Sequence, residues 1–93
     1  MIIAVESWEI SLPECRSLKD KRRVVKSLKE RLQHRFRVSV AETRFQDTWT
    51  RAELTAAVVT TDRAHADSIL DSLDRFVEGD GRGVILRTER SYR

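Results

Sequence analysis

Residues 17–32, SLKDKRRVVKSLKERL, predict a helix with one apolar and one basic side. This helix constrains the fold of the whole chain, because the rest of the chain must supply a surface that covers its apolar side. Ser17, followed three residues later by Asp20, has the pattern of a capping box, in which each side chain bonds a backbone N–H at the helix start. Such a helix must bury its apolar side against another element. The apolar positions at helical spacing are Leu18, Val25, Leu28 and Leu32, with Val24 on the flank.

The segments around this helix have the two-residue period of strands. Residues 2–12 predict a first strand, in which Glu6 interrupts the apolar parity and Pro13 ends the strand. Residues 38–45 and 51–60 predict the second and third strands, joined by a polar loop at 46–49. The apolar parity of the first strand comprises Ile2, Ala4, Trp8, Ile10 and Leu12.

A second helix and a last strand complete the pattern. Residues 60–62, Thr-Thr-Asp, offer a helix cap, and Gly79 is predicted to end the helix in a left-handed conformation. Residues 80–83 form a turn into a strand at 84–89. The apolar stripe of this helix comprises Ala66, Ile69, Leu70, Leu73, Phe76 and Val77.

The order β-α-β-β-α-β predicts an α+β, ferredoxin-like sandwich, with a four-stranded antiparallel sheet and two helices on one face. We expect one domain over residues 1–93, because a chain of this length buries a single core. The other sheet face is left to solvent or to a partner. Its expected members are Ile3, Val5, Ser39, Ala41, Thr55, Ala57 and Val59.

Composition excludes several classes of protein. With 40% hydrophobic residues the chain is too apolar for a disordered tail, and a mean hydropathy of −0.49 argues against a membrane protein. Cys15 is the only cysteine, so we expect no intrachain disulfide and a reducing, cytoplasmic compartment. His34 and His65 have no cysteine at ligand spacing, and we expect no metal and no cofactor. The apolar N-terminal residues lack a basic region, which argues against a signal peptide.

Charge is strongly segregated along the chain. Residues 19–37 hold nine Lys and Arg and only two acids, a local charge of +7, whereas the remaining residues sum to −4. We interpret this as a candidate nucleic-acid-binding face that contacts the phosphates of RNA or the ribosome. The alternative is a solvated face, partly neutralised by an acidic stripe on the second helix, Asp67, Asp71, Asp74 and Glu78. The candidate phosphate contacts are Lys19, Arg22, Arg23, Lys26 and Lys29.

Base-specific readout has no support in the sequence. The third strand has no aromatic residue for base stacking, and Trp8 in the first strand shares the buried parity. No Gly-x-x-Gly loop is present. Any nucleic-acid binding is therefore expected to involve backbone and shape.

The hairpin at 41–52 concentrates polar groups beside two aromatic residues. One interpretation is a recognition site in which Trp49 is the anchor. The alternative is structural: Asp47 caps a turn, Trp49 covers the edge of the core, and Glu42 pairs with an arginine. The candidate recognition residues are Glu42, Gln46, Asp47, Trp49 and Arg51.

Catalysis has little support, and we expect no enzyme and no catalytic residue. Nothing in the sequence fixes the separation of the Glu42 and Asp47 carboxylates. Cys15 follows no pattern that brings a histidine or an acid to its thiol. The three glycines follow a helix and do not open one, unlike those of a phosphate-binding loop.

Two motifs resemble a known family. Residues 16–28 match its opening RSLKxKRxVVxSL, and residues 38–52 match its hairpin VSVAE…QDxWxRA. The chain resembles the YlxP-like family of small bacterial proteins of unknown function over nearly its whole length. The resemblance implies a ferredoxin-like fold, a bacterial cytosolic source and, from neighbouring genes for translation factors, a link to RNA or ribosomes. Glu6 and Trp8 depart from the aliphatic residues usual in the family's first strand.

The leading hypothesis is therefore a non-enzymatic, cytoplasmic module that binds RNA or the ribosome through its basic helix. The alternative is a homodimeric protein-interaction module, or a small-ligand sensor, that uses the open sheet face. No membrane partner is expected.

Overall fold

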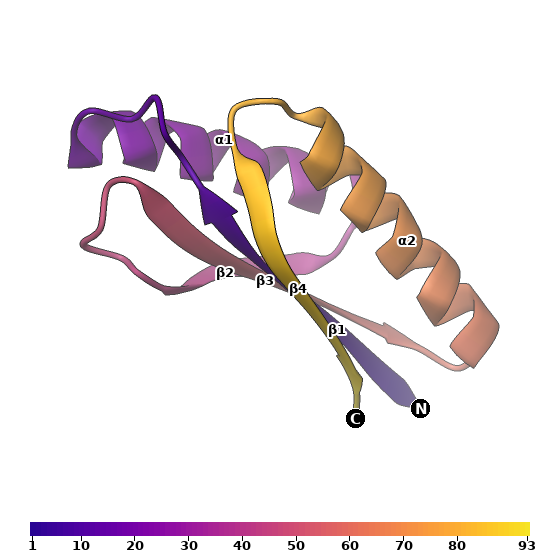
Figure 1. The fold of residues 1–93 in the computed structure, drawn as a ribbon. Coiled ribbons are helices and arrows are strands. Elements are labelled where there is room, and N and C mark those ends of the chain that lie inside the picture. The colour runs from indigo at the N-terminus through magenta and orange to yellow at the C-terminus, as the bar shows by residue number, and fades with distance from the viewer.

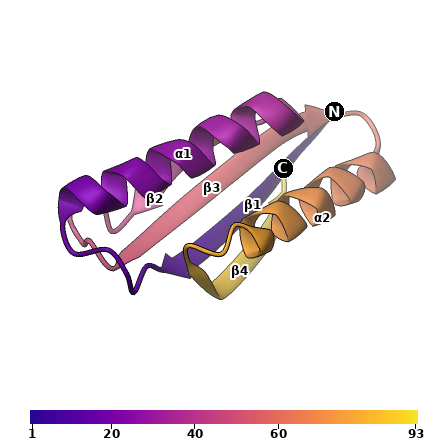
Figure 2. The ribbon, with the colours of Figure 1, turned by 90° about the horizontal axis from the view of Figure 1, so that it is seen from above.

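The computed structural model describes all of residues 1–93 and contains six regular elements. The strands form one antiparallel sheet in the order β2-β3-β1-β4, with both helices on the same face (Figure 1). Seen from above, α1 lies along the β2–β3 side and α2 along the β1–β4 side (Figure 2). The predicted ferredoxin-like architecture is confirmed. The elements are β1 (Ile2–Ser11), α1 (Leu18–Phe36), β2 (Ser39–Arg44), β3 (Arg51–Thr60), α2 (Arg63–Gly79) and β4 (Val84–Tyr92).

The core lies between the helices and one face of the sheet. Both predicted helix stripes face it except at Leu18, and the predicted parity of β1 is buried from Ala4 to Leu12 but not at Ile2. The parity includes Glu6, whose side chain is as fully enclosed as that of Trp8. The largest fully buried apolar side chains are Trp8, Leu12, Leu32, Leu54, Leu70 and Leu73.

The N-termini of the two helices are capped much as the sequence predicts. Ser17 Oγ accepts from the N–H of Asp20 at 3.1 Å. Asp20 Oδ2 accepts from the N–H of Arg16 at 3.1 Å, one residue before the group used in a capping box. Asp62 caps α2, accepting from the N–H of His65 at 3.0 Å.

The end of α2 and the length of β4 differ from the prediction. Gly79 is the last residue of α2, and Asp80 after it remains in the right-handed region. Gly81, with a φ of 80°, supplies the left-handed turn instead. β4 continues to Tyr92 because Arg90 and Tyr92 on its helix side find acidic partners on α2, which an apolar periodicity does not reveal.

A partly buried ionic group, the Arg90 cluster, joins β1, β4 and α2, and comprises the buried Glu6 and the more exposed Arg90, Asp67, Asp71 and Asp74. Arg90 Nε and Nη2 donate to the two oxygens of Glu6, each at 2.9 Å. Nη2 also lies 3.0 Å from Asp71 Oδ1 and from Asp74 Oδ2. Burial raises the pKa of Glu6 to about 7, against the lowering effect of Arg90 and with a further increase from Asp74. One guanidinium thus serves several carboxylates.

A second buried charge, Lys21, fastens α1 to the β2–β3 hairpin. Lys21 is 1% exposed, and its Nζ lies 2.8 Å from Glu42 Oε2, an ion pair outside hydrogen-bonding geometry. Nζ also donates to the backbone carbonyl of Phe45. The expectation that Glu42 pairs with an arginine is therefore wrong, because the first turn of α1 places Lys21 directly over β2.

We predict that the free energy of unfolding falls by up to about 3 kcal/mol as the pH rises from about 5 to about 8. The pKa of Glu6 rises from 4.5 to about 7 on folding. The contribution of this group to the free energy of unfolding is therefore complete below pH 4.5 and is lost as the pH rises through about 7. Denaturant unfolding at several pH values measures this. The decline should be absent in Glu6→Gln, and a wild type that becomes more stable over this interval contradicts the assignment.

We also predict that Lys21→Met destabilises the fold by about 3 kcal/mol, because it leaves Glu42 without its partner and frees the hairpin. Lys19→Met, on the same helix but exposed, is the matched control and should cost less than about 0.5 kcal/mol. Equal denaturation midpoints for the two variants would show that Lys21 has no anchoring role.

Candidate nucleic-acid interface

The five predicted phosphate contacts form a basic ridge, defined by Lys19, Arg22, Arg23, Lys26 and Lys29, along α1. Four are exposed and Lys29 is half-buried; Lys19, Arg23 and Lys26 face away from the buried Val25, Leu28 and Leu32, whereas Arg22 and Lys29 flank Val25. At 1.5 Å per residue the ridge extends over about 15 Å. The structure therefore brings these five side chains onto one surface.

The basic ridge is largely free of carboxylate partners. Lys26 lies 4.0 Å from Glu30, and both side chains are well exposed, which makes this a weak pair. No ion pair involves Lys19, Arg22, Arg23 or Lys29. The ridge thus keeps most of its positive charge available to an anion.

The acidic stripe of α2 does not neutralise the ridge. Asp67, Asp71 and Asp74 lie 3.9, 3.0 and 3.0 Å from the Arg90 guanidinium of β4. Glu78 forms no ion pair with α1. The interpretation in which α2 cancels the basic side of α1 is therefore wrong, because Arg90 directs three of these acids to the opposite edge of the sheet.

One ion pair does join α1 to the segment after α2. Arg31 Nη1 donates to Asp80 Oδ1 at 3.0 Å, and Arg82 donates to both oxygens of the same carboxylate at 2.8 Å. The hydrogen bonds from Arg82 lower the pKa of Asp80. Arg31 lies outside the basic ridge, so this contact leaves the ridge unchanged.

A groove of about 460 Å³ runs between α1 and β2 beside the ridge. Gln33, at its wall, donates from Nε2 to the carbonyl of Val40 at 3.3 Å and so links the two elements. The sequence did not predict this groove, because it depends on how far β2 lies from α1. The one sequence signal for the groove is the helical spacing of Lys26, Lys29 and Gln33, which places these three residues on the same side of α1. The lining residues are Arg22, Val25, Lys26, Lys29, Glu30, Gln33 and Glu42.

The five predicted recognition residues of the hairpin do not form one site. Glu42 is held by Lys21, and Gln46 Nε2 donates to the carbonyl of Glu42 at 3.3 Å. Arg51 instead lies over the sheet, 3.6 Å from Glu9 of β1. Residues of a hairpin point to both faces of a sheet, so sequence proximity does not gather them.

The structural expectations for the hairpin loop are also wrong. Asp47 is exposed and its side chain makes no hydrogen bond, and the turn is closed by the N–H of Thr48 bonding the carbonyl of Phe45 at 3.0 Å. Trp49 is 49% exposed and lies outside the core. Phe45, at a φ of 65°, ends β2 one residue earlier than predicted.

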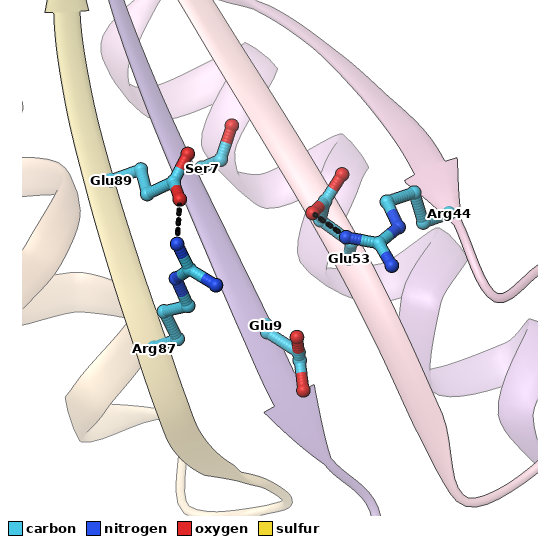
Figure 3. A pocket seen from close by; sticks show the side chains of 6 residues that line it. All are labelled: Ser7, Glu9, Arg44, Glu53, Arg87 and Glu89. Carbon is cyan, nitrogen blue, oxygen red and sulfur yellow. Dashed lines mark hydrogen bonds and ion pairs between the residues drawn. The ribbon is translucent and has the colours of Figure 1, made fainter.

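The open sheet face contains a small polar hollow of about 50 Å³ (Figure 3). Arg44 pairs with Glu53 at 3.8 Å, and Arg87 pairs with Glu89 on the same strand. The volume suits a water or two, far less than the roughly 300 Å³ or more of a small-molecule site. The lining residues are Ser7, Glu9, Arg44, Glu53, Arg87 and Glu89.

The remaining candidates for chemistry are occupied or shielded. Cys15 is buried, and burial raises the pKa of its thiol, which favours the protonated form over the nucleophilic thiolate. Glu42 is engaged with Lys21, whereas Asp47 points to solvent, so they do not act as a carboxylate pair. Neither helix is long and apolar enough to cross a bilayer.

Comparison with known proteins agrees with the fold and the motifs. The uncharacterized protein YlxP of Bacillus subtilis (strain 168) is 32% identical over 90 residues, which cover 95% of this chain and 98% of that protein. A de novo designed protein with a ferredoxin fold, solved by solution NMR, superposes with a TM-score of 0.62 at 16% identity, over 100% of this chain and 85% of that one. A family model described as a protein of unknown function (DUF503) matches residues 3–90. Because the match spans nearly the whole chain, the chain belongs to the DUF503 family, as its resemblance to YlxP-like proteins predicts.

Proposed function

We propose that this chain is a non-enzymatic, RNA- or ribosome-associated binding module whose contact surface is the basic ridge of α1. The observation that supports this most strongly is the direction of the α2 acids. Three of them meet Arg90 on β4, so four of the five ridge side chains have no carboxylate partner. An uncompensated row of cations attracts a polyanion.

The ridge favours contact with phosphates over contact with bases. Its side chains are all lysine or arginine, and none of the aromatic residues used for base stacking lies among them. Arg22, Lys26 and Lys29 also line the groove beside β2, so a nucleic-acid backbone in the groove would meet three ridge cations, whereas β2 contributes only Glu42 to the lining. The binding that follows is strongly salt-dependent and weakly sequence-dependent.

The open sheet face gives less support to a small-ligand sensor. The charged side chains on this face pair with one another, as Arg44 does with Glu53, Arg51 with Glu9 and Arg87 with Glu89. The hollow between them has a volume of only about 50 Å³. The ridge is the larger unpaired charged surface.

We predict that the wild type binds a fluorescein-labelled oligouridylate and purified bacterial ribosomal subunits with a steep salt dependence. If all five ridge residues contact single-stranded phosphates, the slope of log K against log salt is about −3.5. Arg22→Glu/Lys26→Glu removes two contacts and adds repulsion. It should weaken binding by more than about tenfold and flatten the slope by at least about 1.4. Fluorescence polarisation across a salt series measures both quantities.

The matched control is Arg75→Glu/Arg93→Glu, which changes the net charge equally at two exposed positions off the ridge. It should retain most of the affinity. An equal loss in both double variants would mean that only net charge matters, and an unchanged affinity in the ridge variant would exclude the ridge as the contact surface.

A further inference from the structure

The two edges of the sheet differ in how they are protected. β2 spans six residues, and side-chain amides occupy two of its carbonyls: Gln33 bonds that of Val40 and Gln46 bonds that of Glu42, each at 3.3 Å. β4 spans nine residues, and no side chain bonds its backbone. A long, unprotected edge offers a row of free N–H and C=O groups to another strand.

The hydrogen bonding to β1 shows which groups on β4 are free. Ile3 and Arg93 exchange both backbone hydrogen bonds, each at 2.8 Å. Such pairs alternate along an antiparallel ladder, so in the regular register from Ile3 to Glu9 the backbone groups of Thr88, Arg90 and Tyr92 face away from β1. The bulge beside Glu9 interrupts the ladder just before Arg87. The regular free edge is therefore residues 87–92.

We propose that β4 pairs with β4 of a second copy of this chain, antiparallel and centred on Thr88, to form a continuous eight-stranded sheet. A two-fold axis makes two identical strands antiparallel. The free N–H and C=O of Thr88 then bond the same groups of the second copy. On the open face, Arg87 lies opposite the second copy's Glu89, and Glu89 lies opposite the second copy's Arg87.

Charge selects this register over its neighbours. If the β4–β4 strand pair were centred on residue 87, the two Arg87 side chains would lie opposite each other. If it were centred on residue 89, the two Glu89 carboxylates would lie opposite each other. Centring on Arg90 would oppose two guanidiniums. Opposite charges directly across a strand pair stabilise it, whereas like charges destabilise it. Charged residues usually discourage pairing at an edge, but here their order is self-complementary.

The side chains that would change partner are accessible. The side chains of Arg87 and Glu89 are 68% and 63% exposed, so their pairing within one strand is weak and can be exchanged across the axis. Val84 and Leu86, 57% and 48% exposed, precede them, and the C-terminal end of the second copy's β4 would run past both. α1, which carries the ridge, lies along the β2–β3 side of the sheet and away from β4 (Figure 2), so pairing through β4 leaves both ridges free.

Sedimentation velocity over a concentration series tests the proposal. The wild type should form a dimer at high-micromolar concentration. Arg87→Glu and Glu89→Arg each place like charges across the axis and should raise the dissociation constant at least about tenfold. An equimolar mixture should recover the dimer, because each variant then meets opposite charges. Both variants lose the same internal ion pair, so this recovery cannot arise from improved folding.

A control and a cross-link distinguish this interface from other dimers. Val59→Glu, on the open face of β3 and 65% exposed in the wild type, should leave the dimer intact, and its dissociation would favour a face-to-face dimer instead. Thr88→Cys should form an interchain disulfide on mild oxidation, since Cα atoms about 5.5 Å apart can be bridged. Thr61→Cys, exposed elsewhere, should not. A monomeric wild type, or equal cross-linking of the two cysteine variants, would overturn the proposal.

Discussion

The Arg90 guanidinium determines how charge is distributed over this molecule. It bonds the buried Glu6 of β1 and faces Asp71 and Asp74 of α2, so three elements converge on one cation. Removing either partner of such a buried pair is far more costly than removing a surface pair. Because α2 presents its acids to β4, the solvent side of α1 keeps its positive charge. The proposed function depends on this arrangement.

Lys21 and Arg31 show that net charge along the sequence overstates what reaches the surface. Lys21 is enclosed with Glu42, and Arg31 pairs with Asp80. The Arg35 guanidinium lies over the ring of Phe76, 5.7 Å from its centroid. Part of the basic segment thus stabilises the fold, and the ridge is the part that remains for a partner. The unprotected edge of β4 lies at the opposite edge of the sheet from β2, and α1, which carries the ridge, lies along the β2–β3 side, so the two proposed interactions use separate surfaces (Figure 2).

Periodicity predicted all six elements and the exposure of four of the five ridge residues, because both depend on local spacing. It failed where a residue acts through a distant partner. Glu6 interrupts the apolar pattern of β1 yet is fully buried, since Arg90, 84 residues later, completes its environment. In the sequence, Lys21 is indistinguishable from the exposed lysines of α1, and only its position over β2, beside Glu42, shows that it is buried. The groove, the hairpin geometry and the direction of the α2 acids all depend on the packing of separate elements, which no single segment encodes.

We propose that RNA contacts the solvent side of α1 and the adjoining groove, and not the open sheet face. Amide chemical-shift mapping during titration with an oligouridylate tests it most directly, because every backbone N–H reports separately. We expect perturbations concentrated in residues 17–33 and in β2 beside the groove, which diminish as salt is added. Perturbations centred on the open sheet face, around Val5, Thr55 and Val59, would contradict it.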